Sequence, residues 1–293
     1  GGLYIKNGLI EEVGNWSTLN QSLSPDIQRI GIDKNIICLP SYIDCHTHIA
    51  FGGNRANDFA MRNAGHSYLE IAESGGGIWS TVQHTRACSQ EEQEELILER
   101  AHQLLQQGIT TIEVKSGYGL SIDEELKTLR AIQKAHQRSN VDLIATCLAA
   151  HIKPKDFDGT SEQYLQKIAL ELFPKLQAEN LCHRIDAFIE KSAFSANEIL
   201  PYLQKAKALG FDITLHADQF TTSGSQVAIQ IGAVSADHLE ASGELEIQNL
   251  ANSDVVAVAL PAASLGLGCD FTPARKLLDA GSSLAIATDW NPG

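Results

Sequence analysis

The sequence has no apolar run long enough to span a bilayer, few aromatic residues and a single methionine among its 293 residues. Basic residues are also scarce, since 22 Lys and Arg face 36 Asp and Glu and leave a net charge of −14. No stripe of basic residues is present that could neutralise phosphates. These absences argue against a membrane protein and against nucleic acid as a partner. We therefore expect a water-soluble globular protein.

The six cysteines form no CxxC pair, and they are scattered at positions 38, 45, 88, 147, 182 and 269. The first residues also lack the basic and apolar segments of a secretory signal. Reduced cysteines in apolar runs behave as small hydrophobic side chains. The pattern predicts structural thiols in a reducing, cytoplasmic setting.

Eight short apolar runs divide most of the chain, at 36–43, 109–114, 141–150, 185–189, 211–215, 233–236, 255–260 and 284–287. Amphipathic helical patterns lie between most of them, at 90–107, 122–137, 162–177, 196–209 and 223–231. Strands that alternate with helices indicate a parallel sheet, because each parallel crossover needs a dozen or more residues. Eight such units over residues 41–293 predict an α/β fold of the (β/α)8 TIM barrel type. An open doubly wound sheet is the competing architecture.

The first residues follow a different pattern. Residues 3–14 alternate around the pair Asn7 and Gly8, which is the sequence signal of a tight turn between two strands. We expect a β-hairpin there.

Histidine and aspartate recur where the predicted barrel strands end, which is where barrel enzymes carry their active sites. His46 and His48 follow the first strand, and alternation along an extended chain sends both to the same side. Such a pair is weak evidence by itself. His216, His238 and Asp289 end the fifth, sixth and eighth strands in the same way.

Each of these residues also has a structural interpretation, such as a polar cap on a strand or, for Asp289, the N-cap of a helix. Four strand ends with the same feature favour a metal site instead. His46, His48, His216 and Asp289 would supply three nitrogens and one carboxylate oxygen, a donor set that suits zinc or iron and leaves both open.

The chemistry expected of such a site is metal-assisted hydrolysis. Asp289 is placed to accept the proton of the attacking water and to pass it to a leaving nitrogen. His238 exceeds what a tetrahedral site needs, so we interpret it as an electrophile that polarises the substrate carbonyl or as a group that holds the hydroxide.

The arrangement of these residues resembles the amidohydrolase superfamily. Five strings narrow the resemblance to the imidazolonepropionase family: FGGNR at 51–55, ESGGGI at 73–78, EVKSGYGL at 113–120, HADQF at 216–220 and ATDWNPG at 287–293. The resemblance runs along essentially the whole chain, and the strings SGYGL and HADQF are far more specific than the histidine pair.

The resemblance implies hydrolysis of 4-imidazolone-5-propanoate to N-formimino-L-glutamate in histidine degradation, by attack of a hydroxide bound to one zinc or iron ion. It puts substrate-binding roles on Arg55, Tyr118, His151, Gln219, Asn291 and Gly293. Arg55 would pair with the propionate carboxylate through its planar fork. Gln219 can hydrogen-bond but cannot carry a proton, so proton transfer would fall to Asp289 or His238.

Other features have structural interpretations. Superfamily members with two metals use a modified lysine from strand four, where this chain has Glu190 and Lys191. The resemblance argues for one metal, and we interpret Glu190 and Lys191 as an ion pair. Three glycines at 75–77 fit a tight turn, and we leave them out of the site.

The resemblance also implies a small β-sandwich domain built from both ends of the chain. We assign residues 1–40 to its N-terminal portion and residues 41–293 to a barrel that is apparently truncated after its eighth strand. We expect the sequence to be a fragment whose last helix is missing. A homodimer is the default expectation for an enzyme of this size.

Two alternatives stay open at this point. A deaminase acting on a cyclic amidine would keep the metal site, change Arg55 and Tyr118, and release ammonia. A non-catalytic relative would keep the fold and lose the activity.

Overall fold

The computed structural model describes residues 1–32, 35–66, 70–71 and 74–293. The chain forms two compact units, Gly1–Pro40 and Ser41–Gly293, which are taken one at a time. Glu73, the first residue of the string at 73–78, lies outside the described residues.

The small unit contains the expected hairpin. Strands β1 (Gly2–Lys6) and β2 (Leu9–Gly14) pair antiparallel. Asn7 and Gly8 both have positive φ, at 53° and 77°, as a two-residue hairpin turn requires. Helix α1 (Trp16–Ser22) follows, with the Asn15 side chain as its N-cap. The sequence patterns did not predict this helix, and the β-sandwich assignment of the unit stays a prediction.

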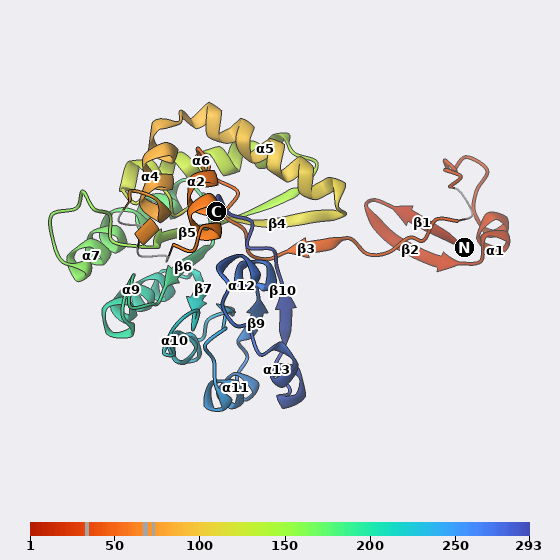
Figure 1. Cartoon of the computed structure of the whole chain (residues 1–293). Coiled ribbons are helices and arrows are strands. Elements are labelled where there is room, and N and C mark those ends of the chain that lie inside the picture. Colours follow the sequence, from red (N-terminus) through yellow and green to blue (C-terminus); the bar gives the residue numbers. More distant parts are fainter. Residues whose placement is uncertain (33–34, 67–69, 72–73) are drawn as a thin grey trace. The chain divides into compact units, whose positions relative to one another are not determined.

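The large unit is built on eight parallel strands that follow chain order in the sheet (Figure 1). They are β3 (Tyr42–Asp44), β4 (Ile109–Lys115), β5 (Asp142–Ala150), β6 (Arg184–Phe188), β7 (Asp212–Ala217), β8 (Ser235–His238), β9 (Val256–Ala259) and β10 (Leu284–Ile286). Helices connect the strands and lie outside them, so the predicted barrel is confirmed and the open doubly wound sheet is not.

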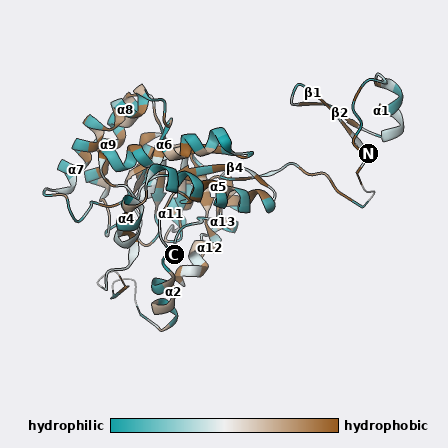
Figure 2. Ribbon diagram, turned by 90° about the horizontal axis from the view of Figure 1, so that it is seen from above, coloured by the Kyte–Doolittle hydropathy of each residue, from teal (hydrophilic) through white to brown (hydrophobic). Residues whose placement is uncertain are grey.

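The helices described in this unit are α2 (Ala56–Asn63), α4 (Gly77–Ala87), α5 (Gln90–Gln106), α6 (Ile122–Arg138), α7 (Ser161–Glu171), α8 (Phe173–Ala178), α9 (Ala196–Ala208), α10 (Gly224–Ile231), α11 (Glu244–Ala251), α12 (Pro261–Leu267) and α13 (Ala274–Ala280). Figure 2 shows hydrophilic and hydrophobic residues side by side along α5, α6 and α9. Their apolar faces pack on the strands, where Ile112, Ile132 and Leu203 join one continuous core. Local signals also fix helix starts, since Ser89 and Glu92 form a capping box at α5.

Two predicted elements differ from the structure. The run at 36–43 does not form the first strand, because β3 begins only at Tyr42 and the Ile37 side chain is 81% exposed. Pro40 interrupts that run and cannot donate to a strand ladder. The helix predicted at 162–177 is broken into α7 and α8 around Leu172, because Pro174 lacks the N–H that a continuous helix needs.

The first and last strands of the barrel meet beyond their ends. Thr47 and Trp290 form a parallel bridge. The His48 N–H donates to the Trp290 carbonyl at 2.8 Å, and the Asp289 N–H donates to the His46 carbonyl at 3.1 Å. These bonds close the barrel at the edge where the predicted site residues lie.

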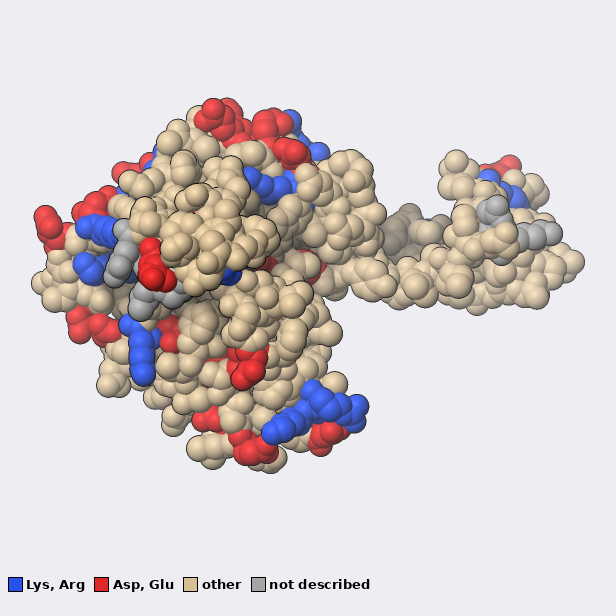
Figure 3. Space-filling view, in the orientation of Figure 1, with Lys and Arg blue, Asp and Glu red and all other residues tan. Residues whose placement is uncertain are grey.

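The surface of the barrel unit carries charges of both signs. Figure 3 shows Asp and Glu next to Lys and Arg on this face. Within the described ranges, no helix combines the length and the apolar character needed to cross a membrane.

We predict that Asp44→Ala weakens the closure of the barrel. Asp44 is buried and accepts hydrogen bonds from the Thr288 N–H at 3.1 Å and the Thr288 hydroxyl at 2.6 Å. Loss of bonds to a charged acceptor should lower the free energy of unfolding, measured in urea, by about 2–4 kcal/mol. The matched control is Asp279→Ala, which removes an exposed helical pair with Arg275 and should cost under about 0.5 kcal/mol. Equal costs for the two variants would contradict a special role for Asp44.

Candidate metal centre and substrate cavity

Four histidines and one aspartate meet at the carboxyl ends of the barrel strands. His46 and His48 follow β3, His216 lies in β7, His238 ends β8, and Asp289 follows β10. All five are buried, between 0% and 8% exposed. Strand register explains in part why these side chains lie close together. His216 pairs with Phe188 of β6, and His238 pairs with Ala217 of β7.

Ring nitrogens and a carboxylate oxygen converge in this cluster. His48 Nε2 lies 3.1 Å from His216 Nε2. Asp289 Oδ1 lies 3.4 Å from the Nε2 atoms of both His46 and His48. Four ligands around one zinc ion at ordinary bond lengths are separated by about 3.3 Å. The spacing therefore fits atoms that share a cation.

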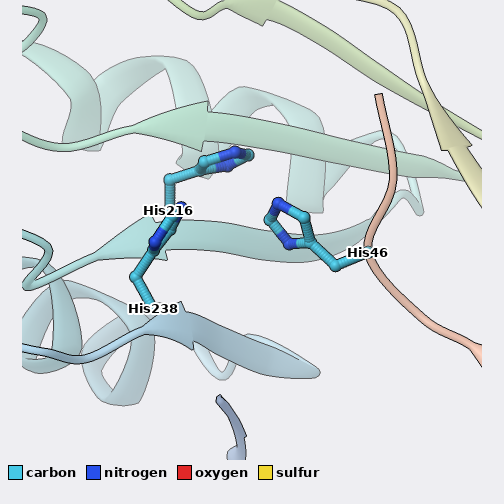
Figure 4. Close-up of side chains that lie close together, drawn as sticks. All are labelled: His46, His216 and His238. Carbon is cyan, nitrogen blue, oxygen red and sulfur yellow. The ribbon is translucent and has the colours of Figure 1, made fainter. Parts of the chain in front are cut away.

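The cluster contains two groups with metal-ligand spacing, and both include His46. One is His46, His48 and Asp289, and the other is His46, His216 and His238. His238 was predicted to lie outside the ligand set, whereas the structure brings it to the same cluster. Figure 4 shows the rings of His46, His216 and His238 turned toward one another.

The donor chemistry of the cluster suits a divalent cation. His46 Nε2 has no hydrogen-bond partner within the described part of the chain, although it is fully buried. Burial lowers the pKa of both His48 and His216, which keeps these rings neutral with a free lone pair. Buried lone pairs without donors are costly unless they bind a cation.

Neighbouring charges shift the pKa values of His46 and Asp289. Burial and the Lys115 charge act to lower the pKa of His46, but the hydrogen bond to Asp237 and the nearby Asp289 carboxylate outweigh them and raise it to about 9. Burial acts to raise the pKa of Asp289, yet the hydrogen bond and charge of His46 hold it below its usual value. Asp289 is therefore ionised.

Carboxylates behind the cluster orient two of the histidines. Asp237 Oδ2 lies 2.7 Å from His46 Nδ1, and Asp186 Oδ2 lies 3.0 Å from His216 Nδ1. Of these two contacts, only the one between His46 and Asp237 is a hydrogen bond. A carboxylate bonded to the outer ring nitrogen fixes the tautomer and aims Nε2 at a metal. Neither aspartate was predicted as a site residue, although each is an acidic residue within or directly after a predicted strand, which was the available signal.

The predicted ion pair between Glu190 and Lys191 is wrong. Glu190 is buried and accepts hydrogen bonds from the Phe220 N–H, the Thr221 N–H and the Thr221 hydroxyl, at 2.7–2.8 Å. Lys191 is exposed, and no ion pair of it lies within the described residues. Glu190 thus anchors the loop after β7, which carries Gln219, because three donors of that loop bind its carboxylate. The Lys191 backbone N–H donates to it as well, at 3.1 Å.

A cavity of about 490 Å³ opens beside the histidine cluster. Its lining includes the predicted site residues His48, Arg55, Tyr118, His151, His216, Gln219, His238, Asp289, Asn291 and Gly293. These side chains come from the loops after most of the barrel strands. The geometry therefore brings residues from across the sequence to one space.

Arg55 is held with one edge of its guanidinium unused. Its Nε donates to the buried Thr81 hydroxyl at 2.8 Å, and its Cζ lies 5.8 Å from the centre of the Tyr118 ring. Its Nη2 is buried and has no hydrogen-bond partner among the described residues. This edge can bind a carboxylate.

His151 is fixed in one tautomer at the cavity wall. Its Nδ1 lies 3.0 Å from the Gly117 carbonyl, which can only accept, so Nδ1 carries the hydrogen. Burial lowers the pKa of His151 to about 4, which keeps the ring neutral. Its Nε2 is therefore an acceptor.

Asn291 and Gly293 build the turn beside Arg55. The Asn291 side chain donates to the Asp289 carbonyl at 2.7 Å and accepts from the Gly293 N–H at 2.9 Å. The Arg55 N–H donates to the Pro292 carbonyl at 3.0 Å. A Cβ on Gly293 would approach Arg55 Cδ to 3.2 Å, so the turn packs closely on this arginine.

Solved structures define the class of the fold. The chain is similar to 5-methylcytosine deaminase from Klebsiella pneumoniae, with a TM-score of 0.70 and 14% identity, over 99% of this chain and 73% of that one. It is also similar to an adenosine deaminase from Xanthomonas campestris solved with bound zinc, with a TM-score of 0.58 and 18% identity, over 85% of this chain and 56% of that one. The fold is that of the amidohydrolases.

Curated relatives narrow the class. The chain is 44% identical over 256 residues to an imidazolonepropionase of Bdellovibrio bacteriovorus, covering 87% of this chain and 60% of that protein. It is 39% identical over 294 residues to an imidazolonepropionase of Fusobacterium nucleatum, covering 100% of this chain and 71% of that protein. The chain belongs to the imidazolonepropionase family, and it spans about 60% of the length of its Bdellovibrio relative. A scan against models of protein families finds no match.

We predict that His46→Ala and His216→Ala each remove bound metal. Each variant deletes a ring nitrogen of the cluster, so metal affinity should fall by more than about a hundredfold, beyond the loss expected for an outer partner. Elemental analysis after dialysis measures the metal content. His102→Ala, which changes an exposed histidine on α5, is the control and should keep its metal. Full metal content in both cluster variants would remove them from the ligand set.

Proposed function

We propose that the protein is a metal-dependent hydrolase that opens the cyclic amide 4-imidazolone-5-propanoate to N-formimino-L-glutamate. The observation that carries the proposal is one cavity lined both by the histidine cluster and by Arg55. Such a cavity fits a small ring that carries a carboxylate. The family relationship supports the same substrate.

His46, His48, His216 and Asp289 would hold one zinc or iron ion. Such an ion supplies a Lewis acid, which polarises a carbonyl and lowers the pKa of water. The adenosine deaminase with this fold was solved with bound zinc, which supports a metal in this protein.

Arg55 binds the propionate carboxylate of the substrate. Arg55 lines the cavity, and the Thr81 hydroxyl and the Tyr118 ring hold its side chain in place. Tyr118 offers its phenol to the same carboxylate or to the ring. The turn of Asn291 and Gly293 supports this end of the cavity, because it packs on Arg55.

His151 and Gln219 orient the imidazolone ring. Neutral His151 accepts a hydrogen bond from a ring N–H at Nε2, because its Nδ1 is occupied by Gly117. Gln219 donates or accepts through its amide and carries no proton in the reaction. Both residues line the cavity beside the histidine cluster.

Asp289 and His238 move protons and charge during hydrolysis. Water adds its oxygen to the ring carbonyl carbon, and the Asp289 carboxylate accepts the proton that water loses. The bond from that carbon to the ring nitrogen breaks, and Asp289 returns the proton to this nitrogen. His238 stabilises the charge on the carbonyl oxygen through its ring N–H. Glu240 Oε1 lies 3.5 Å from His238 Nδ1, on the outer side of this ring.

We also propose a cytoplasmic location and a homodimeric state, and we expect no nucleic-acid partner. All six cysteines are free thiols, which a reducing compartment maintains. The net charge of −14 disfavours phosphate backbones.

The proposed reaction can be tested by following the ultraviolet absorbance of freshly made 4-imidazolone-5-propanoate in the presence of the protein. Loss of the imidazolone with appearance of N-formimino-L-glutamate and no ammonia is the expected result. Ammonia release would indicate a deaminase instead. Metal-loaded protein without turnover would refute the proposed substrate.

We predict that Arg55→Lys weakens substrate binding. The charge is kept but the planar fork is lost, so KM should rise by about tenfold to a hundredfold while kcat changes less. Steady-state kinetics measure both constants. Arg62→Lys is the matched control, because Arg62 also lines the cavity but donates to the Gly266 carbonyl. An unchanged KM in Arg55→Lys would place the carboxylate elsewhere.

We predict that Asp289→Asn largely stops turnover. An amide cannot accept the proton of water, so kcat should fall by at least about a hundredfold. Metal content is measured on the same preparation to separate proton transfer from metal binding. Near-normal kcat in the metal-loaded variant would exclude Asp289 as the proton acceptor.

A further inference from the structure

Lys115, at the end of β4, is a buried cation that the proposed chemistry does not use. Its side chain is 0% exposed. Its Nζ lies 2.8 Å from Asp186 Oδ2, 2.9 Å from Glu113 Oε1 and 4.0 Å from Asp237 Oδ2. Burial acts to lower the pKa of Lys115, but these carboxylates raise it above its usual value, so the ammonium is charged.

Two of the three carboxylates also lie next to an imidazole of the histidine cluster. Asp186 Oδ2 lies 3.0 Å from His216 Nδ1, and Asp237 Oδ2 lies 2.7 Å from His46 Nδ1. The same oxygen of each aspartate thus faces Lys115 on one side and an imidazole on the other.

The third carboxylate binds the backbone between His46 and His48. Glu113 Oε2 accepts a hydrogen bond from the Thr47 N–H at 3.3 Å. The Lys115 N–H also donates to the Thr47 carbonyl at 3.0 Å. Lys115 therefore lies next to residues that adjoin each histidine of the cluster, in the chain or in space.

The Lys115 ammonium is a positive charge that lies among these three carboxylates. Three buried carboxylates that lie close together repel one another, and a buried charge without a partner is strongly unfavourable. One ammonium between them offsets that repulsion and fixes which oxygen each carboxylate turns toward a histidine. A neutral side chain of similar length would leave the carboxylates free to rotate apart.

We propose that Lys115 is a positioning residue that sets the orientation of the metal-binding imidazoles through Asp186, Asp237 and Glu113. This inference rests on the proposed metal site. Lys115 touches neither substrate nor metal. Its effect is to preorganise ligands that come from separate strands, so that Nε2 of His46 and of His216 point into the cluster before a metal arrives.

The test is a titration of metal-free protein with Co²⁺, whose visible absorption reports both affinity and tetrahedral geometry. In Lys115→Met we expect at least about tenfold weaker Co²⁺ binding and a weaker absorption band, which is the range for loss of an outer partner. The matched control is Lys127→Met, since Lys127 pairs with Glu124 on α6 and donates to the Arg86 and Cys88 carbonyls. It should bind Co²⁺ as the unchanged protein does.

A second variant keeps the inference testable if Lys115→Met does not fold. Glu113→Gln with Lys115→Met removes one charge of each sign, so the net charge of the buried group is unchanged. It should bind Co²⁺ at least about tenfold more weakly than Glu113→Gln alone. Circular dichroism confirms that both variants are folded.

The outcomes separate this inference from the proposed site. If the unchanged protein binds Co²⁺ and both Lys115 variants bind it equally well, Lys115 has only a structural role and the inference is overturned. If the unchanged protein binds no Co²⁺, the proposed metal site is overturned and the inference with it. Weaker binding confined to the Lys115 variants supports positioning.

Discussion

The closure of the barrel between its first and last strands is the constraint on which the site depends. Backbone bonds join His46 to Asp289 and His48 to Trp290, and they bring a histidine pair near residue 46 to a carboxylate near residue 289. They leave Asp289 Oδ1 at 3.4 Å from two ring nitrogens. Asp44 reinforces this closure, because its carboxylate accepts hydrogen bonds from the Thr288 backbone N–H and hydroxyl. Fold and metal centre are therefore coupled through the same few bonds.

Periodicity and strand polarity were enough to predict most of the histidine cluster. Alternation put His46 and His48 on one side, and parallel strands put His216, His238 and Asp289 at one edge, so residue type and position sufficed. The first strand and the helix at 162–177 were wrong in their bounds, since proline effects at Pro40 and Pro174 outweighed an apolar pattern.

Partners that span two strands could not be predicted in this way. Asp186, Asp237 and Lys115 were visible as charges within or directly after predicted strands, but which of them meet depends on strand register and side-chain rotamer. Glu190 is a similar case. It follows a strand and precedes a lysine, yet its carboxylate binds the loop after the next strand, because three donors there outweigh one exposed ammonium. The role of such a residue thus depends on hydrogen bonds to distant parts of the chain, and its neighbours in the sequence do not reveal it.

Backbone strain is concentrated where the strands give way to the site. Asp218, His238 and Asp289 have φ values of 50°, 83° and 51°, a left-handed conformation that costs non-glycine residues about 1–3 kcal/mol each. Each is offset by side-chain bonds across the loop. Asp218 accepts from Ser223 and Ser225, the His238 carbonyl accepts from Thr272, and the Asp289 carbonyl accepts from Asn291. The barrel core supplies the remaining stability. The sharp turns let His238 and Asp289 face the cavity rather than continue along the strands, so the strain is a consequence of building the site at these ends.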